Sequence, residues 1–232
     1  MNFIKNKLFV LILLTTYILP LGGIGISGIG NSISTNKTES DGNFNLGFNS
    51  KGLENGLNIF IYFDALPKKL AIEYNREIKW QLGNMSLNQE LLEESIEGEF
   101  VTIRKSDYLT VRKELMGFAI PILAKATVYI GGGVNQHETV APSIDLLKDI
   151  YQVDNVDALY DAAAGNWDAS SLFDLLDNNT IKSTGLHLQA GVQGKLLILN
   201  VFANARYTFI LNDEQSSIKS FPGLTIGVAY GI

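Results

Sequence analysis

Apolar and polar residues alternate along several stretches of the chain, most clearly over residues 184–209. There, Leu186, Leu188, Ala190 and Val192 alternate with polar or small residues, and a turn at 194–195 leads into a second alternating run over 197–209. A period of two places alternate side chains on opposite faces of a sheet. Strands of soluble sheets have about five or six residues, whereas a tilted strand that crosses a bilayer needs roughly 9–11. The pattern therefore predicts a hairpin of membrane-spanning length.

Six further alternating runs bring the predicted strands to eight, an even number that suits a closed barrel. They cover residues 43–49, 57–64, 70–80, 109–121, 126–135 and 224–232. The predicted connections 66–69, 123–125 and 194–195 are short, whereas 81–108, 135–183 and 211–222 are long; only 50–55 breaks the alternation. Short and long connections are typical of periplasmic turns and extracellular loops, respectively. The sequence predicts an all-β fold, an eight-stranded antiparallel up-and-down transmembrane β-barrel with one long, partly helical extracellular loop.

The long connection 135–183 differs in composition from the strands. Residues 143–152 and 156–164 have helical apolar spacing, with Ser143 and Asn155 as candidate N-caps, and 170–176 is a third candidate helix. Residues 136–182 hold nine acidic residues and two lysines. We expect this segment to stand off the membrane surface and to meet an unknown extracellular partner that is cationic or bridged by Ca²⁺.

The N-terminal segment has the features of an export signal. Lys5 and Lys7 precede an apolar run that is short for a membrane-spanning helix. The predicted organisation is a signal peptide over 1–25 with cleavage within 22–30, a polar linker over 31–41 and a barrel domain over 42–232. A retained single-span anchor is the alternative.

Composition excludes several classes of function. Charged residues make up 18% of the chain, below the roughly 25% usual for soluble proteins. The net charge of −6 argues against a nucleic-acid partner. The absence of cysteine excludes disulfides, thiol catalysis and cysteine-ligated metals.

The strand pattern, the alternation of connections and the chain end GLTIGVAYGI resemble the small eight-stranded outer-membrane barrels of the OmpA/OmpX type, the outer membrane protein β-barrel domain family. The resemblance covers about residues 41–232 and carries no catalytic motif. It implies a location in the bacterial outer membrane. It also implies outer-membrane lipid, periplasmic chaperones and the barrel-assembly machinery as partners.

Alternation alone does not say which face points inward, and a soluble lipocalin-like barrel also alternates. The polar face is rich in Asn, Gln, Gly, Thr and Ala, which favours a hydrogen-bonded lumen over a water-facing exterior. Arg76 interrupts the apolar face, as a bulge or at a membrane edge. The polar residues predicted to converge inside, as a buried network or as the lining of a narrow path, are Glu73, Glu77, Lys79, Arg112, Glu114, Gln189, Asn200, Asn204 and Arg206.

Candidate catalytic and metal-binding residues are few. His137, beside Glu138 and near Ser143, matches no signature of a lipid-modifying enzyme, so a solvated loop histidine is the expectation, and His187 is expected in the lumen. The glycines 131–133 lack the rest of a phosphate loop, and the acids at 154, 157 and 161 lack the pattern of a Ca²⁺ loop. We therefore predict no enzyme activity, no cofactor and no metal site. Two hypotheses remain, a surface binding or envelope-structural module acting through its loops, and a narrow passive pore or transporter.

Overall fold

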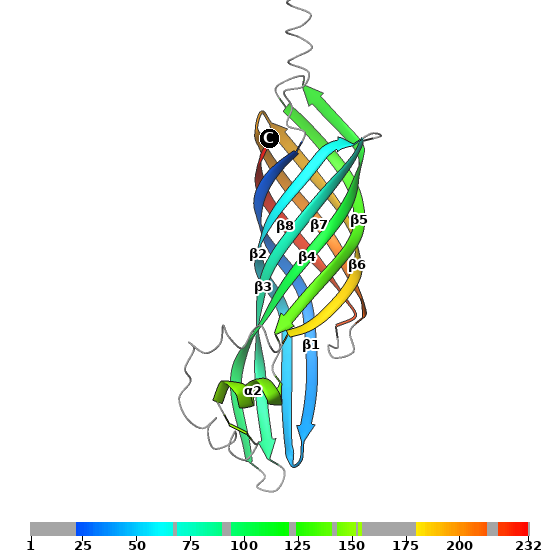
Figure 1. The fold of residues 1–232 in the computed structure, drawn as a ribbon. Helices are drawn as coiled ribbons and strands as arrows, with labels where there is room; N and C mark the ends of the chain where they lie inside the picture. Colours follow the sequence, from blue (N-terminus) through cyan, green and yellow to red (C-terminus); the bar gives the residue numbers. More distant parts are fainter. Residues whose placement is uncertain are drawn as a thin grey trace, which may run out of the picture.

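Eight antiparallel strands close into a barrel in the computed structural model of the protein (Figure 1). The structure describes residues 22–66, 69–89, 94–120, 124–140, 143–151, 153–154, 180–212 and 218–231. The strands are β1 (Gly22–Asp41), β2 (Phe44–Leu66), β3 (Leu70–Gln89), β4 (Glu94–Ile120), β5 (Ala124–Val140), β6 (Thr180–Leu196), β7 (Leu199–Asn212) and β8 (Ser220–Gly231). Each strand pairs with the next, and β8 pairs with β1. The predicted up-and-down barrel is confirmed.

The two faces of the wall have the composition that the alternation predicted. Polar and aromatic side chains point inward, where Asn58, Glu77 and Thr110 are at most 2% exposed. Leucine, isoleucine and valine point outward on all eight strands, and Leu57 and Ile226 are more than 60% exposed. This wall is the reverse of a soluble barrel, whose apolar face surrounds the interior.

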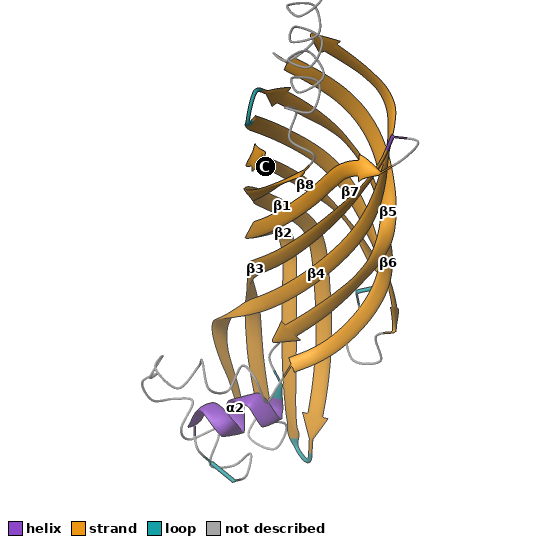
Figure 2. Cartoon of the chain, turned by 45° about the horizontal axis from the view of Figure 1, so that its top comes forward, coloured by secondary structure: helices purple, strands orange, loops and turns teal. Residues whose placement is uncertain are grey.

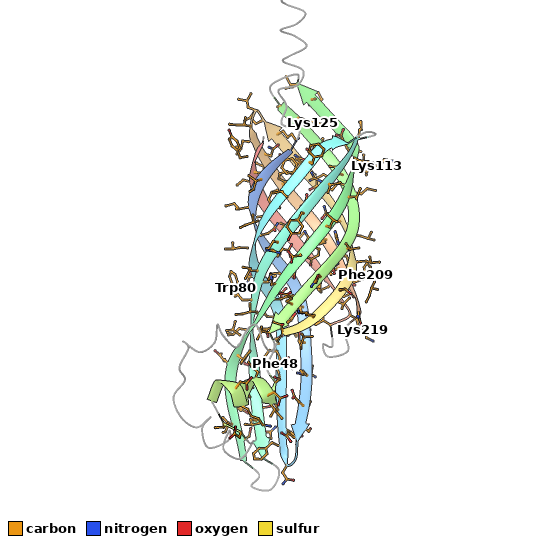
Figure 3. All side chains as sticks on the ribbon, viewed as in Figure 1. Phe48, Trp80, Lys113, Lys125, Phe209 and Lys219 are labelled. Carbon is orange, nitrogen blue, oxygen red and sulfur yellow. The ribbon has the colours of Figure 1, made fainter. Side chains whose placement is uncertain are left out.

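Aromatic and basic side chains mark the two ends of the apolar wall. Trp80 and Phe209 lie on the outer surface toward the end from which β1 to β4 project, whereas Lys113 and Lys125 lie toward the opposite end (Figure 3). Aromatic side chains at the border of an apolar band are typical of the membrane–water interface.

Beyond one end of the closed ring, four strands continue as an open sheet (Figures 1 and 2). The pairing of β1 with β8 stops at Asn31↔Gly223 and that of β4 with β5 at Ile103↔Val140, but β1 to β4 go on pairing with one another. We call residues 32–53, 82–89 and 94–102 the projecting sheet. The register between β2 and β3 shifts between Asn49 and Asn55, where Gly52 has a φ of 125° that favours glycine.

The helix α2 (Ile144–Tyr151) packs against the projecting sheet. It confirms the first predicted helix, and the Ser143 hydroxyl accepts a hydrogen bond from the Leu146 N–H at 3.0 Å, as an N-cap does. The helices predicted over 156–164 and 170–176 lie outside the described residues. Within the described part of the chain, no helix is long and apolar enough to cross a membrane.

The N-terminal boundaries predicted from the sequence are wrong. Residues 31–41 are not a linker but the second half of β1, and the described part of the barrel already includes Gly22, well before residue 42. The runs 43–49 and 57–64 are parts of one strand, β2. Residues 22–30, where we expected signal cleavage, pair with both β2 and β8, so cleavage there would cut the strand that closes the ring. Residues 1–21 lie outside the described chain, and a signal peptide stays a prediction.

Two predicted connections are also strands. Most of 81–108 and all of 50–55 are paired, so the expected strict alternation of short and long connections does not hold at the projecting end. The tight turn between β6 and β7 is Leu197-Ile198, not Gly194-Lys195, which continue the ladder opposite Val201 and Asn200. Lys195 keeps the inward parity of β6 and binds Asp64, which explains why the strand does not end there.

We predict that a charge on the wall is tolerated at its end but not within it. Ile226 and Leu211 are similarly exposed, at 69% and 67%, so arginine fits sterically at either position. Ile226→Arg places a charge within the apolar wall, where it costs about 2–4 kcal/mol near the bilayer midplane, whereas Leu211 lies past Phe209 at the end of β7. Heat-modifiable gel migration after refolding into liposomes should show a loss of folded protein for Ile226→Arg only. Equal losses would contradict the assignment of the wall to lipid.

Candidate functional site

The centre of the lumen holds a buried carboxylate between two cations. Glu77 accepts hydrogen bonds from Lys79, at 2.8 Å, and from Arg206, and all three side chains are at most 5% exposed. Glu77 and Lys79 are two residues apart on β3 and share its inner face, whereas Arg206 extends from β7. Such a group is stable only when each desolvated charge has a partner.

A second cluster lies nearer the end that carries the short turns. Arg112 forms ion pairs with Glu73 at 3.0 Å and with Asp64 at 2.9 Å, and Lys195 binds the other Asp64 oxygen at 2.5 Å. A third cluster lies toward the projecting sheet, where Glu54 binds Arg104 at 3.2 Å and accepts a hydrogen bond from Asn31 at 2.8 Å. Among the described residues, the charges inside the lumen thus form three groups, each around one or two carboxylates.

The structure places the remaining predicted lumen residues separately. Glu114 is half-buried at the short-turn end and pairs with Lys69 and Lys125. Asn204 accepts a hydrogen bond from the Tyr129 hydroxyl. Gln189 and Asn200 are buried on β6 and β7.

Aromatic rings fill the lumen beside the Arg112 cluster. The Phe202 ring packs edge-on against Phe60 and Tyr62, with centroids 5.2 Å apart in each pair. The Arg112 guanidinium carbon lies 4.6 Å from the centroid of the Tyr129 ring and 5.5 Å from that of Tyr62. An eight-stranded barrel is just wide enough for its own side chains. These side chains occupy much of this level, and a hollow of about 270 Å³ lined by Arg112 and Tyr129 opens beside them.

Both histidines are structural members of the lumen. We expected His137 to be a solvated loop residue, but it lies in β5 and is only 1% exposed. Its Nδ1 pairs with the Ser106 hydroxyl at 2.7 Å, and its Nε2 pairs with the side-chain amide oxygen Oδ1 of Asn135 at 2.9 Å. His187 is in the lumen as predicted, bonded to Thr110 at 2.8 Å.

The inner face of the projecting sheet is apolar and is covered by α2. Ile144 and Leu147 pack on Phe44, Leu46 and Leu87, and Leu146 packs in a second cluster with Phe48, Phe100 and Val140. Figure 3 shows Phe48 within this part of the molecule. A hydrogen bond from Lys148 to Asp41, at 2.8 Å, joins the helix to the tip of β1 and raises the pKa of Lys148. The helix is thus a cover for the sheet.

The projecting sheet also carries a polar hollow of about 690 Å³. Amide, hydroxyl and carboxylate groups dominate its lining, which consists of Asn36, Gly47, Phe48, Asn49, Asn84, Met85, Ser86, Glu97, Gly98 and Glu99. The described residues of the projecting sheet and α2 together hold seven carboxylates and three lysines. This hollow therefore offers hydrogen-bond acceptors in an acidic setting.

No group of three or more His, Asp or Glu side chains is placed to hold a metal ion within the described residues. Asp154 is described, but Asp157 and Asp161 lie outside the described residues, so the structure does not test that acidic spacing. The glycines 131–133 lie within β5, where they pair with β4 and β6.

Comparison with known proteins gives only distant structural likeness. No protein-family model matches the chain, and no curated protein matches it. The attachment invasion locus protein Ail of Yersinia pestis, in complex with the heparin analogue sucrose octasulfate, is 10% identical with a TM-score of 0.36; the match covers 90% of this chain and 99% of that one. Neisserial surface protein A (NspA) is 11% identical with a TM-score of 0.39, covering 91% and 97%. Likeness at this level carries no argument about the role of this chain.

Sequence reasoning missed Glu54, Arg104 and His137 because they fell in predicted loops. Each has the inward parity of its own strand: Glu54 matches Asn58 on β2, and Arg104 matches Arg112 on β4. Extending the run 126–135 by its parity would have found His137, whereas Asn55-Gly56 and Ser106-Asp107 resemble turns and separate Glu54 and Arg104 from their predicted runs.

We predict that loss of the central carboxylate destabilises the barrel far more than loss of the one at the mouth. Glu77→Gln leaves Lys79 and Arg206 buried without a charge partner, which costs about 3–5 kcal/mol. Glu114→Gln removes partly exposed pairs, which are worth about 0–1 kcal/mol. Urea unfolding of the refolded proteins measures both changes. Similar unfolding midpoints for the two variants would mean that the Glu77 cluster is not desolvated as described.

Proposed function

We propose that the protein is a non-enzymatic barrel of the bacterial outer membrane that binds an extracellular partner through its projecting sheet. The observation that carries this proposal is the continuation of four strands beyond the closed, apolar-walled ring, with a polar hollow on the sheet and a helix that covers its inner face. An outward apolar wall suits lipid, and short turns at the opposite end suit the periplasmic side.

This location implies further partners. The proposal includes export through a signal peptide within residues 1–21. It also includes periplasmic chaperones, the barrel-assembly machinery and outer-membrane lipid as partners. Residues 135–183 also stay a proposed partner-binding segment, although the ends of β5 and β6 belong to the barrel and α2 has its apolar residues turned to the sheet.

The chemistry of the hollow defines the class of partner. Carboxylates and amide oxygens accept hydrogen bonds, and Glu97 and Glu99 add negative charge. The complementary ligand is rich in hydroxyl groups and carries cationic groups, such as an amino sugar. Glu97 and Glu99 also lie on β4 beyond its pairing with β5, where charge discourages the addition of another strand.

The test uses chitosan oligomers as cationic probes and their N-acetylated counterparts as neutral ones. Wild-type protein in liposomes should bind the cationic oligomers more tightly. The double variant Glu97→Gln, Glu99→Gln should weaken that binding about tenfold, the equivalent of roughly 1.4 kcal/mol. Asp145→Asn on the exposed side of α2 is the matched control and should bind as wild type does. Binding that is unchanged in the double variant would rule out this hollow.

The alternative role, a narrow passive pore, is disfavoured by the side chains that fill the lumen around Arg112 and Phe202. We expect refolded wild-type protein in a planar bilayer to show no steady ionic conductance, under conditions in which an open-pore control conducts. A reproducible ohmic step from the wild type would instead establish the pore.

A further inference from the structure

A cluster of polar side chains interrupts the apolar outer wall on β3 and β4. Arg76 and Asp107 lie opposite each other in the ladder, and Arg76 Nε donates to Asp107 Oδ1 at 2.8 Å while its Nη2 lies 3.4 Å from Oδ2. The Tyr74 hydroxyl donates to the same Asp107 oxygen. The register between β3 and β4 is unbroken here, so the cluster is not the product of a bulge.

The cluster has exposed aliphatic side chains on both sides along β3 and on one side along β4. Ile72 and Ile78 flank it on β3, and Leu109 and Val111 follow it on β4; all four are at least 40% exposed. Arg76 precedes Trp80, which lies toward the projecting end of the wall (Figure 3), by four residues. Arg76 also lines an apolar hollow of about 720 Å³ on the outer surface, together with Ile59, Ile78 and Trp80.

A second ion pair stands beside the first. Lys105, two residues from Asp107 on β4, binds Glu138 of β5 at 2.9 Å. The outer face of β3 to β5 therefore carries two ion pairs, each with its cation and its anion on adjacent strands. The side chains of Arg76 and Lys105 remain 55% and 44% exposed.

Ionisable groups within a membrane are costly in lipid, and they commonly face protein or a polar cavity. We propose that the β3–β5 face binds a second copy of this chain, and that Arg76 and Asp107 lie at the two-fold axis of the dimer. The proposal rests on the membrane location given under the proposed function.

Charge complementarity favours a second copy as the occupant. A two-fold axis along the membrane normal sets identical patches face to face with their lateral order reversed. The Arg76 of each copy then faces the Asp107 of the other, which makes four alternating charges out of two ion pairs. The apolar residues around the cluster, such as Leu109 and Ile78, pack across the same contact and exclude lipid from it.

Cysteine cross-linking tests the position of the contact, because the natural chain has no cysteine. Leu109→Cys places a thiol on β4, two residues from Asp107, and Leu224→Cys places one on β8, on the opposite wall of the ring. In liposomes at low protein density, mild oxidation should link Leu109→Cys at least about tenfold faster than Leu224→Cys, since contact raises the effective concentration of the thiols. Equal rates would overturn the proposal.

Charge reversal tests the partner. Each copy of the Arg76→Asp variant presents two acids at the axis, and each copy of the Asp107→Arg variant presents two cations. Because like charges then face each other, either variant alone should dimerise about tenfold or more weakly than the wild type. An equimolar mixture of the two variants should restore association as a heterodimer, measured by energy transfer between labelled copies. Failure of the mixture to associate would overturn the two-fold arrangement.

The same experiments separate a failed inference from a failed proposed function. Heat-modifiable migration and flotation with liposomes report folding and insertion, so a wild type that inserts but stays monomeric at every lipid ratio overturns only the dimer. If either reversal variant does not fold, the neutral double variant Arg76→Met, Asp107→Asn replaces it and should insert but dimerise about tenfold more weakly. Unchanged dimerisation of this variant would show that the ion pair is not at the contact.

Discussion

The closed ring of backbone hydrogen bonds is the constraint on which the rest of this protein depends. A strand in lipid finds no water for its N–H and C=O groups, so every strand must have a neighbour on both sides and the sheet must close. Closing at eight strands leaves an interior only as wide as the side chains that fill it. The clusters around Glu77, Glu73 and Glu54 follow from that width. A polar lumen too narrow for bulk water must supply its own counter-charges, and each carboxylate therefore touches a lysine or an arginine.

The projecting sheet shows what happens where the ring ends. Once β1 and β4 lose β8 and β5 as neighbours, no opposite wall faces the inward side chains. Within the closed ring, the charged side chains of the interior pair with one another. In the projecting sheet, the inward residues Phe44, Leu46 and Leu87 are apolar and need a cover. The helix α2 supplies it, and the change in chemistry along β2, from Asn58 and Glu54 to Phe48 and Phe44, coincides with the change from wall to helix as the packing partner.

Much of the barrel could be predicted from periodicity, because alternation survives wherever the outward side chain is a large aliphatic. It failed at β1, where glycine occupies positions on both faces. Gly25 is small because the Phe60 ring fills the space inside, and an added Cβ there would lie 2.5 Å from that ring. The pattern of β1 therefore depends on its cross-strand neighbours and not on its own residues. The lumen residues on well-defined strands, such as Glu77 and Arg206, could be named, but which cation meets which carboxylate is set by the barrel's register and could not.

An ion pair between an arginine and a carboxylate has different consequences on the two sides of this wall. Inside, Arg206 and Glu77 have no alternative environment, because the ring holds both side chains in place, and their pairing fills space as well as neutralising charge. Outside, Arg76 and Asp107 are free to be replaced by aliphatic residues like those around them without any loss of closure, since the ladder between β3 and β4 is regular there. The fold explains the inner pair completely, but it gives no reason for the outer one. A polar group that neither the barrel's closure nor its packing needs is best explained by something that lies against it.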